Sequence, residues 1–320
     1  MARRDTGTDD PRVRVRASKS TRPRSKLRPT FENAPIGQVT AIDRGRYQVQ
    51  VEGHDVQCIK ARELGRGGVV MGDLARIDGD ISGTPGSLAR IVQIRPREHV
   101  LRRSLEDADG RAEKIIVANA DLMVVVVAAT NPEPRTGMVE RCLVAAKVAD
   151  IPTLLCMTKS DLADPAPFTN NFQHFDMKII DAQNQIQELR DELKDKFSVL
   201  VGHSGVGKST LINKLVPDAD RQVGSVNNAT GKGRHTSTSS VALALPSGGW
   251  VVDTPGVRSF GLGHASPADV LAVFPGLQEA AQTCLPLCTH LDDEPACALR
   301  DFPDQDLVGR ARRLLNGIQR

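Results

Sequence analysis

An eight-residue pattern near the middle of the chain restricts its fold more than any other feature. Residues Gly202–Ser209 read GHSGVGKS and fit the phosphate-loop pattern G-x-x-x-x-G-K-[S/T]. An apolar run (199–201) precedes the loop and a second one (Leu211, Ile212) follows it, which is the strand–loop–helix context that such loops need. The alternative is a glycine-rich turn without a ligand. We predict a nucleotide-binding loop, because its glycines and helix N-terminus favour phosphate.

The residues of this loop have distinct expected roles. Lys208 is expected to reach the terminal phosphates, and the Ser209 hydroxyl is expected to bind Mg²⁺. His203 occupies a free position of the pattern, where a solvent-facing side chain is the default interpretation. The residues predicted to contact the nucleotide here are Gly202, His203, Ser204, Gly205, Val206, Gly207, Lys208, Ser209 and Thr210.

A second motif follows a short apolar strand further along the chain. Asp253-Thr254-Pro255-Gly256 comes directly after the run Trp250–Val252. An aspartate at a strand end, downstream of a phosphate loop, suits contact with Mg²⁺, and the Gly256 N–H suits the γ-phosphate. A D-x-x-G pattern alone is weak, but the phosphate loop before it strengthens the prediction.

A third motif predicts which base the site accepts. Thr158-Lys159-Ser160-Asp161 ends another apolar run and resembles the guanine motif N-K-x-D, with Thr in place of Asn. The Asp161 carboxylate can accept hydrogen bonds from the N1–H and the exocyclic amine of guanine. Adenine lacks this pair of donors and would leave a desolvated carboxylate partly unpaired. The motif therefore favours GTP, while an ATP-using enzyme and a simple strand-to-loop turn are the alternatives.

The order of the three motifs is unusual. In ordinary GTPases the phosphate loop comes first and the guanine motif last. Here the guanine motif (158–161) precedes the phosphate loop (202–209), and D-x-x-G (253–256) comes last. We interpret the chain as a circularly permuted GTPase, which is physically tolerable because domain termini often lie close together at the surface.

The hydrophobic pattern predicts three folded modules behind a basic arm. Short alternating runs with Gly turns predict a small β-barrel over 35–100. Alternating strands and helices over 105–264 predict an α/β domain with a mostly parallel sheet. Residues 265–320 predict a small helical module. The expected strands of the α/β domain are 122–129, 152–158, 197–202, 241–245 and 250–253; the expected helices are 139–148, 182–194, 208–216, 267–274 and one from about 304.

The charge of the chain is unevenly distributed. The overall net charge is +3, but residues 1–30 hold ten Lys and Arg against three Asp, or +7, and the other 290 residues carry −4. Residues 1–34 have almost no apolar periodicity, so we expect a disordered arm. A basic arm on a weakly acidic body predicts a polyanionic partner.

A cluster near the C-terminus has the composition of a zinc site. Cys284, Cys288, His290 and Cys297 place three thiols and one imidazole within 14 residues. Cys₃His is a common structural zinc set, and three unrelated thiols near a histidine are the alternative. The remaining cysteines, Cys58, Cys142 and Cys156, lie on apolar runs far apart in the sequence and are expected to be core or lone residues.

Three further features bear on the compartment. The longest apolar run, Leu122–Ala129, is too short to span a bilayer, and the charged N-terminus is not followed by the apolar core of a secretory signal. Six cysteines in 320 residues are too few for a disulfide framework. We expect a cytoplasmic protein without a membrane partner.

The motifs together resemble one family. The permuted order, the barrel before it, the stretch GHSGVGKSTLIN, Gly233-Arg234-His235-Thr236 and DTPGVRSF are similar to the ribosome small-subunit-dependent GTPase A (RsgA/YjeQ) family over about residues 35–315. The resemblance implies an OB-fold barrel, a permuted GTPase domain and a zinc-binding helical domain. It also implies a factor of late small-subunit maturation, whose GTP hydrolysis the subunit stimulates and whose release is coupled to that hydrolysis.

The resemblance also implies roles for residues between the motifs. Thr236 would be the switch residue that closes on Mg²⁺ and the γ-phosphate, and His235 would assist hydrolysis; the alternative is that His235 only contacts RNA or phosphate. Val257 follows DTPG where Ras-like enzymes place the Gln that orients water, and an aliphatic side chain cannot do this. His235 or a group from the ribosome must then do so, and intrinsic turnover should be slow.

The chain departs from the family pattern at several positions. Thr158 starts the guanine motif, Asp181-Ala182 replaces a Ser-Ala pair near the base, and the cysteine spacing differs by one residue in two gaps.

Aromatics make up 3% of the chain, so we expect charge-driven contact of the barrel with rRNA instead of base stacking. A solvated face is the alternative. The basic residues in question are Arg44, Arg46, Lys60, Arg62, Arg66, Arg95 and Arg97.

The C-terminal arginines leave two interpretations open. Arg310, Arg312 and Arg313 lie on one predicted amphipathic helix, where they could meet rRNA or form a solvated face.

We expect a monomer whose partners are GTP or GDP and the small subunit with its rRNA. The rival function from another class is an RNA-binding platform with a vestigial GTPase.

Overall fold

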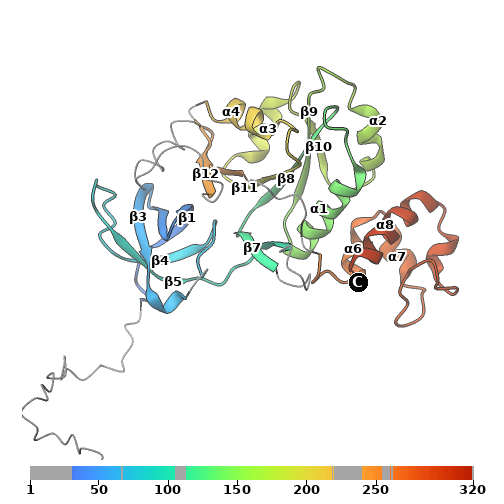
Figure 1. Cartoon of the computed structure of the whole chain (residues 1–320), viewed down its shortest axis with the longest axis horizontal. Coiled ribbons are helices and arrows are strands. Elements are labelled where there is room, and N and C mark those ends of the chain that lie inside the picture. Colours follow the sequence, from blue (N-terminus) through green and yellow to red (C-terminus); the bar gives the residue numbers. More distant parts are fainter. Residues whose placement is uncertain are drawn as a thin grey trace, which may run out of the picture. The chain divides into compact units, whose positions relative to one another are not determined.

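The computed structural model describes residues 31–65, 68–104, 113–217, 219, 240–253, 260 and 262–318 (Figure 1). The chain divides into Met1–Glu32 and Asn33–Arg320, and all elements below belong to the second unit. Most of the predicted basic arm lies outside the described residues. Within the described part of the chain, no helix has the length and apolar character needed to cross a membrane.

Five strands at the start of the second unit close into a barrel. They are β1 (Ile36–Asp43), β2 (Arg46–Val51), β3 (His54–Lys60), β4 (Leu74–Gly79) and β5 (Ala89–Ile94). The strands pair in the order β1-β2-β3-β5-β4, and β4 pairs again with β1, so the sheet closes on itself. Alternate side chains fill its interior, including those of Tyr47, Val49, Val51, Val56 and Ile91. The predicted barrel is confirmed.

The next strands form the α/β sheet. They are β8 (Leu122–Ala128), β9 (Thr153–Thr158), β10 (Lys178–Asp181), β11 (Phe197–Val201), β12 (Ser240–Ala244) and β13 (Trp250–Asp253). Their order is β10-β9-β8-β11-β13-β12, and only β12 pairs antiparallel within this set. The mostly parallel sheet is therefore confirmed.

Helices cover both faces of this sheet, which explains why β8 is a continuous apolar run. One set of β8 side chains packs with α1 (Thr136–Ala149) and with the C-terminal helices. The alternate set packs with α3 (Ile186–Leu193) and α4 (Lys208–Leu215). All seven residues of β8 are buried, as expected for a parallel strand between two helical layers.

The barrel and the α/β sheet are not separate sheets. β1 pairs antiparallel with β12, with Ala41 opposite Val241 and Ile42 opposite Ser240, so eleven strands form one hydrogen-bonded order. The hydrophobic pattern of the sequence predicts two modules here and does not indicate that a pair of strands joins them. The predicted boundaries near residue 100 and residue 264 stay predictions.

Several short elements have no counterpart in the sequence-based prediction. The hairpin of β6 (Val100–Ser104) and β7 (Glu113–Ala118), strand β10 and the helices α2 (Ala166–Thr169) and α7 (Leu277–Ala281) carry too few residues for a clear period. The 3₁₀ segments are η1 (Arg62–Leu64), η2 (Asn170–Phe172) and η3 (Ala298–Asp301).

The C-terminal region contains two predicted helices with clear local causes. α6 (Pro267–Val273) begins with Pro at its first position and with a capping box, in which Ser266 and Asp269 bond each other's backbone N–H. α8 (Gln305–Ile318) is amphipathic and buries Leu307, Leu314 and Leu315 among other residues. Figure 1 shows α6, α7 and α8 grouped together.

Neither interpretation of the C-terminal arginines holds for two of them. Arg310 is buried, and its Nε donates to Glu140 Oε1 at 2.6 Å. Its guanidinium also lies 5.3 Å from the centre of the Phe172 ring. Arg312 is buried and bonds Asp292. These two arginines therefore hold the fold together, and only Arg313 of the three is exposed.

Arg97 of the barrel also has an internal role. Its guanidinium donates two hydrogen bonds to the buried Asp73 carboxylate, at 2.6 and 2.9 Å. This bidentate pair gives Arg97 a structural role within the barrel. Arg44, Arg46, Arg62 and Arg95 are exposed, Lys60 is half-buried, and Arg66 lies outside the described residues.

The buried Glu140–Arg310 pair should have a large effect on stability. Its side chains are 1% and 7% exposed, so Glu140→Ala leaves an uncompensated buried charge. We expect the free energy of unfolding to fall by about 3–5 kcal/mol. The double variant Glu140→Leu/Arg310→Met should recover most of this loss, because two apolar groups need no partner.

Denaturant unfolding monitored by fluorescence checks this prediction. The exposed pair Lys178–Glu192 is the control, and Glu192→Ala should cost about 1 kcal/mol or less. Equal effects of Glu140→Ala and Glu192→Ala would contradict a structural role for the buried pair.

Candidate functional site

The phosphate loop lies where the sequence predicts it, between β11 and α4. Gly202, Gly205 and Gly207 have φ values of 155°, 82° and 93°, which residues with a side chain rarely adopt. A Cβ on Gly202 would lie 2.4 Å from the Val126 carbonyl oxygen. Glycine is therefore required at this position by close backbone approach as well as by conformation.

Lys208 begins α4 and turns back over the loop. Its Nζ donates to the carbonyl oxygens of Gly202 at 2.6 Å and His203 at 3.0 Å. Burial lowers the pKa of Lys208, and the Asp253 carboxylate opposes this shift. The ammonium is thus held over the loop by two carbonyls, which terminal phosphate oxygens can replace as partners.

Asp253 ends β13 and faces the same place. Burial raises the pKa of its carboxyl group, and Lys208 opposes this shift. Among the described residues, Asp253 Oδ1 is buried and has no hydrogen-bond partner. A buried, unpaired carboxylate oxygen beside a phosphate loop fits Mg²⁺, which prefers oxygen ligands. Ser209, the other predicted ligand within the described part, is exposed in the first turn of α4.

The guanine motif is joined directly to the phosphate loop. Thr158 is buried at the end of β9, and its hydroxyl donates to the Val206 carbonyl oxygen at 2.6 Å. Lys159 follows with a φ of 57° and donates to the Asn131 carbonyl oxygen. Thr158 therefore links the base-binding segment to the phosphate loop through a hydroxyl, although the motif usually starts with an amide side chain.

A cavity of about 270 Å³ lies beside this motif. It is bounded by the guanine motif, by the start of α4 and by the segment after β10. Its lining residues are Thr158, Lys159, Asp161, Leu162, Ala182, Gln183, Gly207, Thr210, Leu211 and Lys214. Five of the predicted nucleotide contacts thus line one cavity: Thr158, Lys159, Asp161, Gly207 and Thr210.

Asp181 supports the cavity from behind. Its carboxylate accepts hydrogen bonds from the Ser160 hydroxyl at 2.7 Å, the Gln183 N–H at 3.0 Å and the Asn184 amide at 2.6 Å. Asp181 is not a lining residue. It links the two segments that line the cavity, a role that sequence reasoning left unassigned.

Several predicted residues cannot be placed. Gly233, His235, Thr236, Gly256 and Val257 lie outside the described residues. Their expected roles at the γ-phosphate stay predictions. Sequence reasoning in turn missed Asn131, Gln183 and Lys214. Lys214 Nζ donates to Gln183 Oε1 at 2.7 Å at the cavity wall. Its position four residues after Thr210, on the same face of α4, is the sequence signal that could have indicated it.

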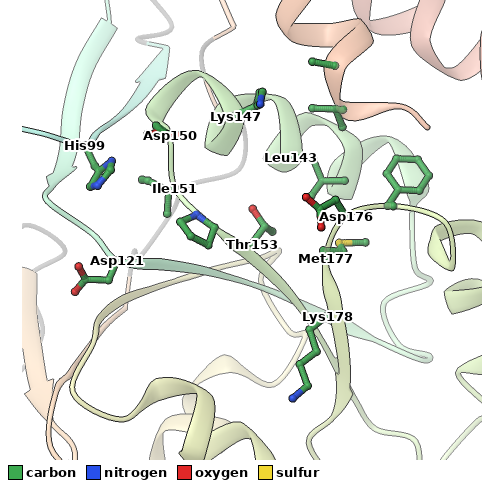
Figure 2. A pocket seen from close by; sticks show the side chains of 14 residues that line it. His99, Asp121, Leu143, Lys147, Asp150, Ile151, Thr153, Asp176, Met177 and Lys178 are labelled. Carbon is green, nitrogen blue, oxygen red and sulfur yellow. The ribbon is translucent and has the colours of Figure 1, made fainter. Parts of the chain in front are cut away.

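A larger cavity, of about 860 Å³, lies near the amino ends of the strands (Figure 2). Two of its polar groups serve the fold: Asp121 accepts from the Phe197 N–H at 2.7 Å, and His99 Nδ1 lies 3.1 Å from the Ala149 carbonyl oxygen. Phosphate loops open at the opposite, carboxyl ends of strands. This cavity is therefore not part of the nucleotide site.

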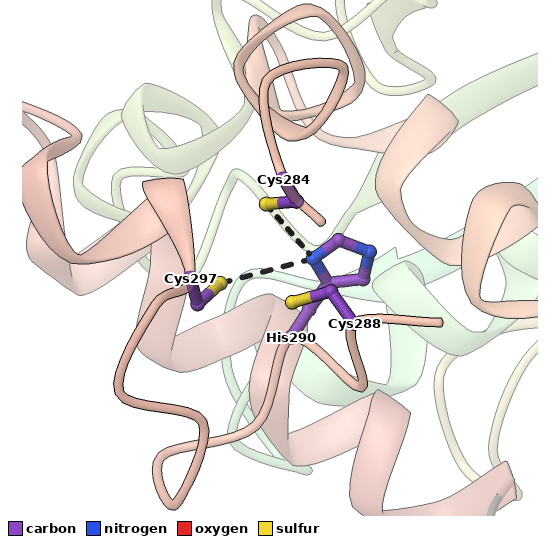
Figure 3. A group of neighbouring side chains, drawn as sticks. All are labelled: Cys284, Cys288, His290 and Cys297. Carbon is purple, nitrogen blue, oxygen red and sulfur yellow. Dashed lines mark hydrogen bonds between the residues drawn. The ribbon is translucent and has the colours of Figure 1, made fainter. Parts of the chain in front are cut away.

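The C-terminal cysteines and histidine do converge. One ligand atom from each of Cys284, Cys288, His290 and Cys297 lies within 4.8 Å of the others. His290 Nδ1 is 3.6 Å from Cys284 Sγ and 3.8 Å from Cys297 Sγ (Figure 3). Three thiols and an imidazole are the donors of a closed tetrahedral zinc site, so the residues fit that ion.

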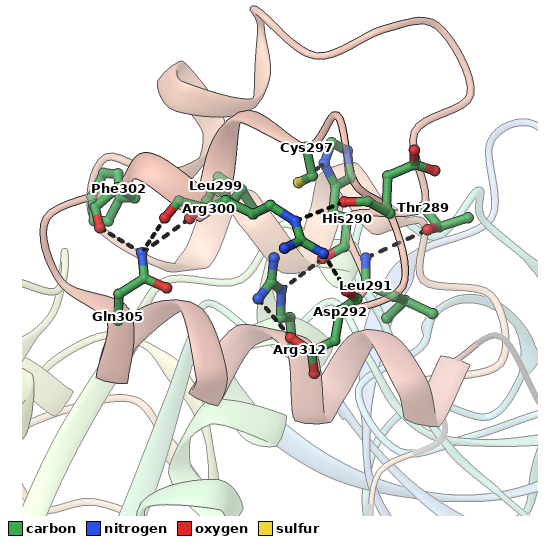
Figure 4. Close-up of polar contacts among 11 residues, drawn as sticks. Thr289, His290, Leu291, Asp292, Cys297, Leu299, Arg300, Phe302, Gln305 and Arg312 are labelled. Carbon is green, nitrogen blue, oxygen red and sulfur yellow. Dashed lines mark hydrogen bonds and ion pairs between the residues drawn. The ribbon is translucent and has the colours of Figure 1, made fainter.

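Arginines and a glutamine surround this cluster (Figure 4). Arg312 Nε donates to the His290 carbonyl oxygen at 3.0 Å, and Arg300 bonds the Asp292 and Glu294 carbonyl oxygens. Gln305 donates to three carbonyl oxygens around η3. Such outer contacts orient metal-binding loops.

The other cysteines are core residues, as predicted. Cys58, Cys142 and Cys156 are buried, and burial raises the pKa of each thiol to about 12. Each therefore stays protonated at neutral pH and packs as a small apolar side chain.

Comparison with known proteins identifies the family that has this arrangement of motifs. The sequence profile of the RsgA GTPase family matches residues 94–263. The small ribosomal subunit biogenesis GTPase RsgA of Pseudomonas fluorescens strain SBW25 is 35% identical over 300 residues, covering 89% of this chain and 86% of the relative. Its namesake in Alcanivorax borkumensis strain SK2 is 38% identical over 223 residues, covering 66% and 62%.

Two solved structures share the fold. YjeQ from Thermotoga maritima superposes with a TM-score of 0.67 at 23% identity, covering 89% of this chain and 98% of that one. YloQ, described as a circularly permuted GTPase, superposes with a TM-score of 0.63 at 23% identity, covering 92% and 98%. The permuted order inferred from the motifs agrees with this likeness. By its sequence profile and its relatives, the chain belongs to the RsgA GTPase family.

Proposed function

We propose that this protein hydrolyses GTP to GDP and phosphate and acts in the maturation of the small ribosomal subunit. The observation that carries the proposal is the joining of guanine motif and phosphate loop at one cavity by the Thr158–Val206 hydrogen bond. The names of the relatives, small ribosomal subunit biogenesis GTPase, supply the process. The protein would work in the cytoplasm as a monomer.

The nucleotide would lie along α4 with its base in the 270 Å³ cavity. Asp161 would accept hydrogen bonds from the guanine edge, and Lys208 would exchange its two carbonyl partners for terminal phosphate oxygens. Ser209, Thr236 and Asp253 would hold Mg²⁺, which neutralises phosphate charge. Gly256 would donate its N–H to the γ-phosphate.

Water attack would need a group that the D-x-x-G segment does not supply, because Val257 cannot orient water. His235 or a ribosomal group would take this role. Slow intrinsic hydrolysis, stimulated by the subunit and followed by release, is the expected cycle. The exposed arginines of the barrel and the basic arm would contact rRNA through phosphate charge. The Cys₃His cluster would hold one structural zinc ion.

One experiment tests the proposal directly. We expect purified small subunits to raise the rate of GTP hydrolysis by the wild type, and we expect His235→Ala to lower the stimulated rate. Phosphate release is measured with and without subunits. A rate that subunits leave unchanged would reject the proposed role, whereas an unaffected His235→Ala variant would transfer water orientation to the ribosome.

Base specificity gives a separate prediction. Asp161→Asn exchanges a pure acceptor for an acceptor and a donor, which no longer match the two N–H donors of guanine. We expect the Kd for GDP to rise at least about 100-fold. Xanthosine diphosphate offers one donor and one carbonyl oxygen and should bind the variant more tightly than GDP does. Competition titration measures both, with Asp164→Asn as the control on the same loop.

A further inference from the structure

The loop between the first two cysteines of the Cys₃His cluster carries two exposed leucines. Six large apolar side chains are exposed among the described residues, and Leu287 at 99% and Leu285 at 66% are the most exposed of them. Leu162, the next, lines the nucleotide cavity and so has a role there. Exposed apolar groups gathered at one place mark interaction sites. The two leucines have no such role within the described part of the chain.

The backbone holds these leucines in a fixed and strained turn. Leu285 and Leu287 lie between the ligands Cys284 and Cys288, and the Cys288 N–H donates to the Leu285 carbonyl oxygen at 3.2 Å. Leu287 has a φ of 68°, a conformation that suits glycine or asparagine. Strained residues of this kind concentrate at functional positions. A turn anchored at both ends presents its side chains with little entropy left to lose on binding.

The charge around this turn selects the kind of partner. Residues 282–297 contain three acidic side chains, Asp292, Asp293 and Glu294, and no Lys or Arg. Two arginines from outside this range contact it, but Arg300 is bonded to its carbonyl oxygens and Arg312 is buried. Asp292 is paired with Arg312, yet its side chain remains 79% exposed. Contact with RNA phosphates depends on Lys and Arg, so this surface is unsuited to rRNA. An apolar tip on ligand loops that carry acidic side chains complements an apolar pocket with a basic rim.

We propose that Leu285 and Leu287 form a docking tip that inserts into an apolar pocket on a basic protein of the small ribosomal subunit. The inference rests on the proposed function, because that function supplies the subunit. It assigns protein contact to the zinc module and leaves rRNA contact to the barrel and the arm.

Serine substitutions test the tip. Leu285→Ser and Leu287→Ser remove apolar surface but no zinc ligand, so zinc content, melting temperature and basal GTP hydrolysis should stay at the wild-type values. Affinity for purified subunits, measured by co-sedimentation, should fall about tenfold for each variant and further for the double variant. Leu88→Ser removes an exposed leucine from the barrel and should leave affinity unchanged.

A photo-crosslinker identifies the partner. Benzoylphenylalanine at position 287 should yield an adduct with a basic subunit protein. An adduct with rRNA, with a second copy of this chain or with its own basic arm would overturn the inference, as would no adduct. Normal wild-type stimulation with unchanged affinity of both serine variants would overturn this inference alone. A wild type that neither binds nor responds to subunits would overturn the proposed function with it.

Discussion

Lys208→Met is expected to lower kcat/KM for GTP about 10²- to 10³-fold, the loss typical of removing one preorganised charge-stabilising donor. The ammonium lies over the loop, bonded to the Gly202 and His203 carbonyl oxygens. It is therefore in position before the nucleotide arrives, and methionine keeps the length of the side chain without its charge. The Asp253 carboxylate loses its nearest positive charge in the same variant.

Single-turnover hydrolysis with [γ-³²P]GTP measures this loss separately from product release. Lys196→Met is the matched control, because Lys196 is a partly exposed lysine in a weak pair with Glu192. The control should keep wild-type turnover. A Lys208→Met variant that hydrolyses GTP within about threefold of the wild type would contradict the assignment of the loop.

Cys297→Ser is expected to abolish binding of the metal ion and to unfold the ligand loops between residues 284 and 297. Structural zinc contributes about 10–16 kcal/mol of apparent binding free energy in small zinc domains. Here the loops between the ligands are held by hydrogen bonds from Arg300 and Arg312 to their carbonyl oxygens, whereas α8 also packs on the rest of the fold through Arg310. We therefore expect local unfolding of the loops while the phosphate loop keeps its nucleotide affinity.

Zinc content by mass spectrometry, with hydrogen exchange of residues 284–297, measures both effects. Removal of the ion from the wild type with a chelator should give the same exchange pattern as the variant. Cys58→Ala is the control, because this cysteine is buried in the barrel. One full equivalent of zinc retained by Cys297→Ser would exclude the Cys₃His assignment.

The elements that sequence predicts well are those with local signals. The phosphate loop, the guanine motif and the predicted zinc ligands each occupy fewer than 15 consecutive residues, so their spacing alone predicts their chemistry. In the structure, the Thr158–Val206 hydrogen bond joins the guanine motif to the phosphate loop, and its two partners lie 48 residues apart in the sequence. A hydroxyl in place of an amide was a departure from the motif, and the contact explains why the chain accepts it.

What sequence misses depends on distant partners. The Glu140–Arg310 pair joins residues 170 positions apart, so the amphipathic pattern of α8 could not separate a buried arginine from a solvated one. Asp181 likewise acts through Ser160, on a different segment. In both cases only the partner residue reveals the structural role of the side chain.

The β1–β12 pairing gives the barrel a role that does not involve a ligand. A central sheet that ended at β12 would present a row of unpaired backbone N–H and C=O groups, and such an open edge invites pairing with other chains. Part of β1 occupies that edge, and the barrel itself closes through β1–β4. The barrel thus covers part of the open edge of the central sheet, so we expect its removal to lower the solubility of the protein even if nucleotide binding survives.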